Sequence, residues 1–235
     1  HVSHNGREFA DLLESLVQEW PITVKDLAIV GHSMGGLIAR SAYHYGCTAN
    51  HRWPQYLRKL IFLGTPHHGT PLERWGNLIN VGLDLSPYTT AFARLGKIRS
   101  AGITDLRYGN LLDEDWNGSD RFAHRRDLRL PLQLPGEVSC YALAALKSER
   151  STAVTDALGD GVVPVGSALG RHKDPAKTLA FLPNHQVVVT GINHFDLLSD
   201  AAVHQQIRSW LAGREHRKLK SCESKKRRLT VAHRK

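Results

Sequence analysis

The sequence GHSMG at residues 31–35 constrains the fold of this chain more than any other feature. A short apolar run at residues 27–30 precedes it, and residues 37–45 after it have the pattern of a helix that Gly46 ends. A G-x-S-x-G motif between a buried strand and a helix forms a tight turn that projects the serine hydroxyl. The motif therefore predicts a strand, turn and helix unit of an α/β fold.

The geometry of such a turn suggests a chemical role for each residue of the motif. Ser33 is the candidate nucleophile, and we expect its backbone to be strained. Gly31 and Gly35 are the expected elbow glycines, because side chains there would collide with neighbouring backbone. The backbone N–H of Met34 begins the following helix, at its positive end, and is a candidate donor to an oxyanion.

A serine nucleophile needs a base, and the base needs a carboxylate to orient it. His194 follows an apolar segment at residues 186–190 and a short turn, which is where this kind of fold carries its base. Asp160 lies between the serine and the histidine in chain order and opens the turn DGVVP; Asp156 is the next candidate for the acid. The sequence thus predicts a catalytic triad of Ser33, Asp160 and His194.

Apolar strand candidates alternate with helical segments along the rest of the chain. Positions 9–20 carry apolar residues on one helical face, and Pro21 ends that helix. A buried strand is expected at residues 59–63, and further short strands, apolar or β-branched, at residues 138–145 and 186–190. This order predicts a mostly parallel sheet flanked by helices, with the site at the carboxyl ends of the strands.

The length suits one α/β domain at residues 1–213. An insertion at about 72–134 is too long for a plain connection, and a helical lid over the site or a surface excursion would both account for it. Residues 214–235 contribute much of the net charge of +9 and are expected to be a disordered basic tail, either simply solvated or touching an anionic surface. No specific nucleic-acid partner is predicted.

The segment GTPHHGTP places His67 and His68 beside the predicted site. Packing or hydrogen bonding at the substrate edge is favoured for both over a metal site, because no carboxylate or cysteine stands at a ligand spacing. His32 is assigned to the same edge. We expect neither a metal nor a cofactor. The three cysteines are widely spaced, which favours a reducing compartment and makes the cytoplasm the default expectation.

The motifs GHSMGG, GTPHHGTPLERW, SAGITDLRYGNLLDEDW, DGVVP and NHFDLL together resemble the lipase-like α/β hydrolases grouped with the GPI inositol-deacylase family, in particular its bacterial members. The resemblance spans roughly residues 27–211. It implies an α/β-hydrolase fold and cleavage of a carboxylic ester or lipid, with Ser33, Asp160 and His194 matching the triad. An acyltransferase with the same triad and a non-catalytic binding module are the alternatives.

One departure from this family concerns the start of the chain. Such enzymes have several strands before the nucleophile, and a loop after an early strand supplies the second oxyanion donor. Here only about 30 residues precede the elbow. We therefore expect the N-terminal strands and the second donor to lie upstream of this sequence. Loss of one donor costs on the order of a hundred- to a thousandfold in rate.

Overall fold

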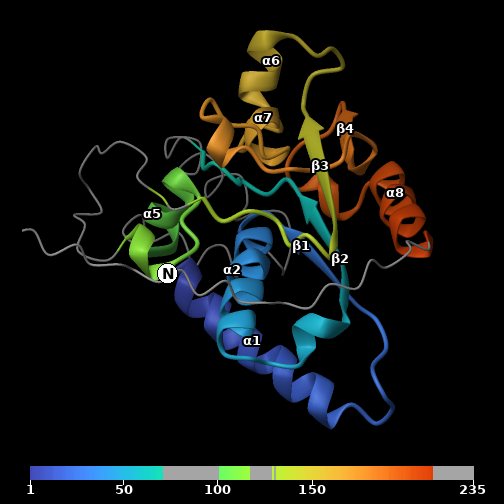
Figure 1. Ribbon diagram of the computed structural model, residues 1–235. Helices are drawn as coiled ribbons and strands as arrows, with labels where there is room; N and C mark the ends of the chain where they lie inside the picture. The colour runs from blue at the N-terminus through green and yellow to red at the C-terminus, as the bar shows by residue number, and fades with distance from the viewer. Residues whose placement is uncertain (71–100, 117–128, 130, 214–235) are drawn as a thin grey trace, which may run out of the picture.

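A parallel four-stranded sheet forms the centre of the molecule in the computed structural model, which describes residues 1–70, 101–116, 129 and 131–213 (Figure 1). The strand order follows the chain, and each neighbouring pair is parallel. The strands are β1 (Leu27–His32), β2 (Leu57–Leu63), β3 (Ser139–Leu146) and β4 (Gln186–Thr190). Most of the predicted insertion and all of the predicted tail lie outside the described residues.

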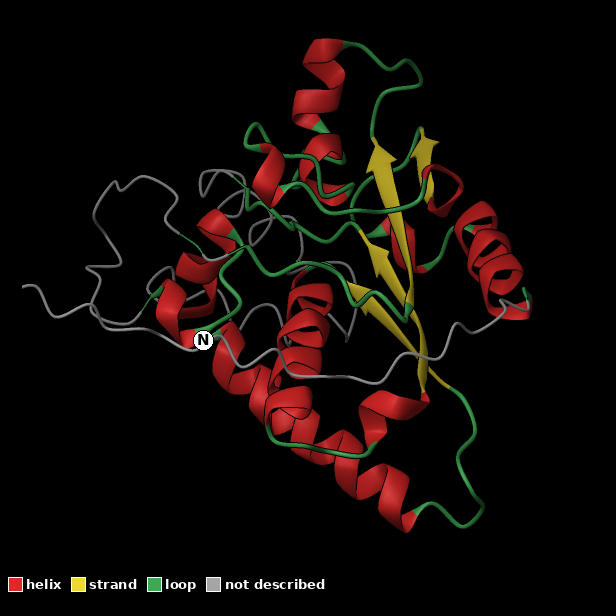
Figure 2. Ribbon diagram, viewed as in Figure 1, coloured by secondary structure: helices red, strands yellow, loops and turns green. Residues whose placement is uncertain are grey.

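Helices cover both faces of this sheet (Figures 1 and 2). Two long helices pack against each other on one face, and the C-terminal helix covers the other. The helices of the described chain are α1 (Val2–Glu19), α2 (Met34–Thr48), α5 (Ala101–Tyr108), α6 (Ala153–Leu158), α7 (Val165–Ala168) and α8 (Ala201–Ala212). Short 3-10 turns lie at Trp53–Tyr56, Asp113–Asp115, Pro175–Lys177, Pro183–His185 and Asp196–Leu198. No described helix is long and apolar enough to cross a membrane.

Successive residues of the central strands face opposite sides of the sheet. In β2, Leu60 and Phe62 join the core under α1 and α2, whereas Ile61 and Leu63 join a second core. Residues of β3 alternate in the same way, and Trp210 of α8 closes the second core. Burial on both faces explains why these strands read as continuous apolar runs in the sequence.

The predicted fold class is confirmed, with each expected strand within two residues of its observed bounds. The first helix differs at its start, because it begins at Val2 and not near Phe9. Small residues make this early contact: a side chain at Gly6 would come within 2.3 Å of the Ser41 hydroxyl. The Val2 N–H donates to Asp105 of α5 at 2.8 Å. An apolar period could not reveal a contact made by small and polar residues.

Strand β1 pairs with β2 on one side only within the described chain. Val30 of this strand is 45% exposed. In helix α1, Leu13 packs into the core, whereas Leu12 and Leu16 are exposed, and so is Trp20, which directly follows the helix. An apolar strand with an unpaired edge fits the expectation of further strands beside β1, which stays a prediction.

Candidate active site

The carboxyl ends of the four parallel strands bring distant parts of the chain to one edge of the sheet. Ser33 directly follows β1, and His194 follows β4 after a short turn. These are the two outer strands of the described sheet, which at about 4.8 Å between neighbours lie about 14 Å apart. The loop that carries His194 must therefore reach across the ends of β2 and β3 to approach Ser33.

Ser33 has the backbone geometry expected of a strained turn between a strand and a helix. Its φ of 55° and ψ of −126° lie where residues other than glycine are rare. Its N–H donates to the Leu63 carbonyl at 2.8 Å, and its own carbonyl accepts from Gly36 at 3.1 Å. Met34 is the first residue of α2, so no earlier helical turn can accept its N–H.

The glycines around this elbow differ from the prediction in one respect. A Cβ at Gly31 would lie 2.7 Å from the backbone of Gly36, as the sequence led us to expect. At Gly35, however, a Cβ would meet nothing within 4 Å, so the predicted collision there is wrong. The second crowded position is Gly36, where a Cβ would come within 2.1 Å of the Thr65 hydroxyl.

Ser33, His194 and Asp160 form a continuous chain of hydrogen bonds. His194 Nδ1 lies 2.6 Å from Asp160 Oδ2, and His194 Nε2 lies 2.9 Å from Ser33 Oγ. A carboxylate only accepts, so Nδ1 carries the proton and Nε2 is left to accept from the serine hydroxyl. All three residues are at most 2% exposed, and exclusion of water strengthens their interactions.

The carboxylate of Asp160 is fixed by its own turn. Its Oδ1 accepts from the N–H groups of Val162 at 2.9 Å and Val163 at 2.8 Å, which leaves Oδ2 for the histidine. Asp156, the second candidate for the acid, lies in α6 and accepts from the Ser151 hydroxyl at 2.8 Å. The geometry thus brings Asp160 to His194, while Asp156 bonds within its own local turn.

A protein-family model described as the PGAP1-like alpha/beta domain matches residues 10–130, slightly more than half of the chain. The chain belongs to this family. No curated protein sequence matches it. Among solved structures, this PGAP1-like chain is similar to Bacillus licheniformis lipase BlEst2 in its propeptide form, with 19% identity and a TM-score of 0.51 over 94% of this chain and 43% of that one.

Two further structures are similar at lower scores. The mature form of the same Bacillus licheniformis lipase is 18% identical, with a TM-score of 0.49 over 90% of this chain and 74% of that chain. A thermophilic esterase is 17% identical, with a TM-score of 0.45 over 88% and 72%. The family match, the parallel sheet and the likeness to the propeptide form together show the α/β-hydrolase fold.

The three histidines predicted at the substrate edge occupy different places in the PGAP1-like chain. His32 is next to the site: its Nε2 lies 3.0 Å from the His194 carbonyl oxygen. His68 is partly buried, with Nε2 2.9 Å from the Gly170 carbonyl. Burial lowers the pKa of His32 to about 4 and that of His68 to about 4 as well, so both are neutral near neutral pH. Whether His32 or His68 touches substrate stays a prediction.

His67 lies in the interior and does not form an exposed edge. Its side chain is fully buried, with its ring edge-on to Phe62 at a centroid distance of 4.8 Å. Arg40 Nη1 donates to His67 Nδ1 at 3.3 Å, and Arg40 Nη2 donates to the Leu132 carbonyl. Burial, followed by the charge of Arg40, holds the pKa of His67 well below its usual value. His67 therefore packs and hydrogen-bonds in the interior of the protein, whereas the sequence analysis placed it at the substrate edge.

Sequence reasoning missed how the GTPHHGT segment contributes to the site of the PGAP1-like domain. Gly64 has a φ of +55°, and a Cβ there would lie 2.7 Å from Leu197 and 3.1 Å from the His194 ring. The glycine therefore leaves the space that His194 occupies. The same segment is tied to the acid turn, because Thr70 donates to the Val162 carbonyl, and to α7 after that turn, because Ser167 donates to the Gly69 carbonyl at 2.8 Å. The available signal in the sequence was the glycine followed by threonine, at residues 64–65 and again at residues 69–70.

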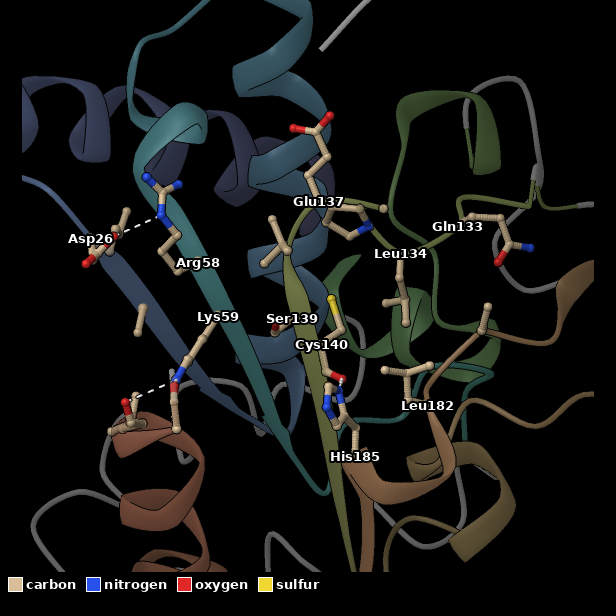
Figure 3. Close-up of a pocket in the computed structure, with 18 of the residues that line it drawn as sticks. Asp26, Arg58, Lys59, Gln133, Leu134, Glu137, Ser139, Cys140, Leu182 and His185 are labelled. Atoms are coloured by element: carbon tan, nitrogen blue, oxygen red, sulfur yellow. Dashed lines mark hydrogen bonds and ion pairs between the residues drawn. The ribbon is translucent and has the colours of Figure 1, made fainter. Parts of the chain in front are cut away.

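A cavity of about 1290 Å³ lies at the opposite end of the sheet, at the amino ends of the strands (Figure 3). Charged side chains of its lining bond to the protein: Arg58 pairs with Asp26 at 2.9 Å, and Lys59 donates to carbonyls at the end of α8. Ser33, Asp160 and His194 do not line it. Within the described ranges, no three His, Cys, Asp or Glu side chains lie close enough to hold a metal ion.

Proposed function

We propose that this protein is a serine hydrolase that cleaves carboxylic esters through an acyl-serine intermediate. The observation that carries the proposal is the unbroken series of hydrogen bonds from Asp160 through His194 to Ser33, at 2.6 and 2.9 Å. Nucleophile, base and orienting acid within such distances define the arrangement that activates a serine hydroxyl. The family match supports the same proposal.

The first half of the proposed reaction forms the acyl-enzyme. Ser33 Oγ attacks the ester carbonyl carbon while its proton passes to His194 Nε2. The imidazolium is stabilised by Asp160 Oδ2, and the oxygen of the tetrahedral intermediate accepts from the Met34 N–H at the start of α2. His194 then returns the proton to the leaving alcohol as the carbon–oxygen bond of the ester breaks.

The second half regenerates the enzyme. His194 takes a proton from a water molecule, whose oxygen attacks the acyl-serine carbonyl, and the proton is given back to Ser33 Oγ as the carboxylic acid leaves. An acyltransferase would use an alcohol in place of this water. A lipid or other ester substrate is the proposed class.

Hydrolysis of p-nitrophenyl esters of graded acyl length tests this proposal. We expect nitrophenol and free acid as products in water, and turnover lower by on the order of a millionfold in Ser33→Ala, as when a triad loses its nucleophile. Added alcohol should leave free acid as the main product. Equal turnover by the Ser33→Ala variant would refute the proposed nucleophile, and dominant formation of the alkyl ester would assign the protein as a transferase.

A further inference from the structure

His194 uses each of its polar groups in the described structure. Its backbone N–H donates to the Asp160 carbonyl at 3.3 Å, its Nδ1 bonds the Asp160 carboxylate, and its Nε2 bonds the serine hydroxyl. The remaining group is the backbone carbonyl, which lies 3.0 Å from His32 Nε2. His32 is the residue immediately before Ser33, so two consecutive residues of the elbow contact the base.

The chemistry of this contact fixes the proton on His32. A carbonyl oxygen only accepts, so Nε2 must carry the hydrogen and Nδ1 must be the unprotonated nitrogen when the ring is neutral. Burial, and then the charge of His194, lower the pKa of His32 to about 4. The ring therefore stays neutral near neutral pH. A neutral donor adds no positive charge beside the imidazolium that His194 forms during catalysis.

The position of the contact matters because of the sheet topology. The loop of His194 leaves β4 and crosses the ends of β3 and β2 to reach the elbow after β1. Asp160 holds the backbone of His194 from the β3 side, through its carbonyl, and His32 holds it from the β1 side. One bond holds the N–H of His194 and the other holds its C=O. Together they limit how far the ring can move away from Ser33 Oγ.

We propose that His32 is a positioning residue for the reaction, which keeps the base at hydrogen-bond distance from the nucleophile by donating to the backbone of His194. This inference rests on the proposed function. The rings of His32 and His194 also lie 4.7 Å apart, tilted by 40°. Packing of the two rings would survive replacement by another aromatic ring, whereas the donor would not, and this difference makes the inference testable.

The test compares His32→Phe, which keeps a ring, with His32→Gln, whose amide nitrogen can donate. We measure the rate at which a fluorophosphonate probe labels Ser33, together with kcat and KM for a p-nitrophenyl ester. Loss of one hydrogen bond should lower the labelling rate and kcat of His32→Phe by roughly tenfold, with KM nearly unchanged. His32→Gln should recover most of the loss. His204→Phe is the matched control, because His204 Nε2 likewise contacts a backbone carbonyl, at 3.0 Å, but that of Leu198 and not that of His194.

Several outcomes would overturn the inference. Wild-type rates in His32→Phe, or equal losses in His32→Phe and His32→Gln, would show that donation by His32 does not position the base. The proposed function fails separately, if the wild-type protein is not labelled at all. Nitrogen NMR of the wild-type histidines gives an answer that needs no variant: His32 should be the Nε2–H tautomer near neutral pH, and an Nδ1–H tautomer would contradict the proposal.

Discussion

Asp160 contacts His194 twice, through its carboxylate and through its backbone. Oδ2 lies 2.6 Å from His194 Nδ1, and the carbonyl oxygen of Asp160 accepts from the His194 N–H at 3.3 Å. The N–H groups of Val162 and Val163 hold the other carboxylate oxygen. The acid turn therefore orients both the ring and the backbone of the proposed base.

This double contact predicts unequal effects at the two candidate acids. Asp160→Asn keeps the size of the side chain but can donate to Nδ1 and favour the wrong histidine tautomer, so kcat should fall by about ten-thousandfold, as in triads of this type. Asp156→Asn should leave kcat within about twofold, because Asp156, on α6, accepts from the Ser151 hydroxyl and not from His194. Steady-state kinetics on an ester checks both variants. Similar losses in the two variants would contradict the assignment of the acid.

Gly64→Ala should disturb the base directly. The new methyl group would enter the space of Leu197 and of the His194 ring, at a φ that favours glycine. We expect a loss of about 1–3 kcal/mol in the free energy of unfolding, together with a slower labelling rate of Ser33. Gly166→Ala is the control, because a Cβ there meets nothing within 4 Å. Denaturant unfolding and probe labelling should separate the variants, and identical behaviour would refute the spatial role of Gly64.

Burial of His68 predicts a pH dependence of stability. Its pKa is lowered from 6.5 to about 4, chiefly by burial. As the pH falls from about 6.5 to about 4, the unfolded chain binds a proton at this site that the folded protein does not bind, so His68 makes unfolding more favourable. In His68→Gln, the slope of unfolding free energy against pH should be smaller by up to one proton over this window. Urea titrations at several pH values measure it, and an unchanged slope would contradict the burial argument.

Replacement of Lys59 should lower the stability of the fold without changing the reactivity of Ser33. Its Nζ donates to the Trp210 carbonyl at 2.5 Å and the Leu211 carbonyl at 3.1 Å, at the C-terminal end of α8. Lys59→Met leaves these acceptors without their cation and should cost about 1–3 kcal/mol. Arg58→Met, on the neighbouring residue, removes a solvent-exposed ion pair with Asp26 worth about 0–1 kcal/mol, together with exposed hydrogen bonds to the Gln55 and Lys25 carbonyls. Thermal unfolding compares them, and the labelling rate of Ser33 should be unchanged in both; a larger loss for Arg58→Met would be inconsistent with the structure.

The elements that the sequence predicted are those whose signal is local. Each strand is a short apolar or β-branched run, and the order of Ser33, Asp160 and His194 along the chain matches the order of the strands they follow. Contacts between distant residues left no such signal. The bond from His32 to His194 joins residues 162 positions apart, and it exists only because the β4 loop crosses the sheet edge. The crowding at Gly36 likewise depends on Thr65 of the next strand loop.

The central claim is that Ser33 is a nucleophile activated by His194. Incubation of the protein with a fluorophosphonate probe, followed by peptide mass spectrometry, tests it most directly. The account predicts a single adduct on the peptide that contains Ser33. In Ser33→Ala this peptide should carry no adduct, and in His194→Ala it should be labelled much more slowly than in the wild type. An unlabelled Ser33 in the folded wild-type protein, or labelling of Ser33 that does not depend on His194, would contradict it.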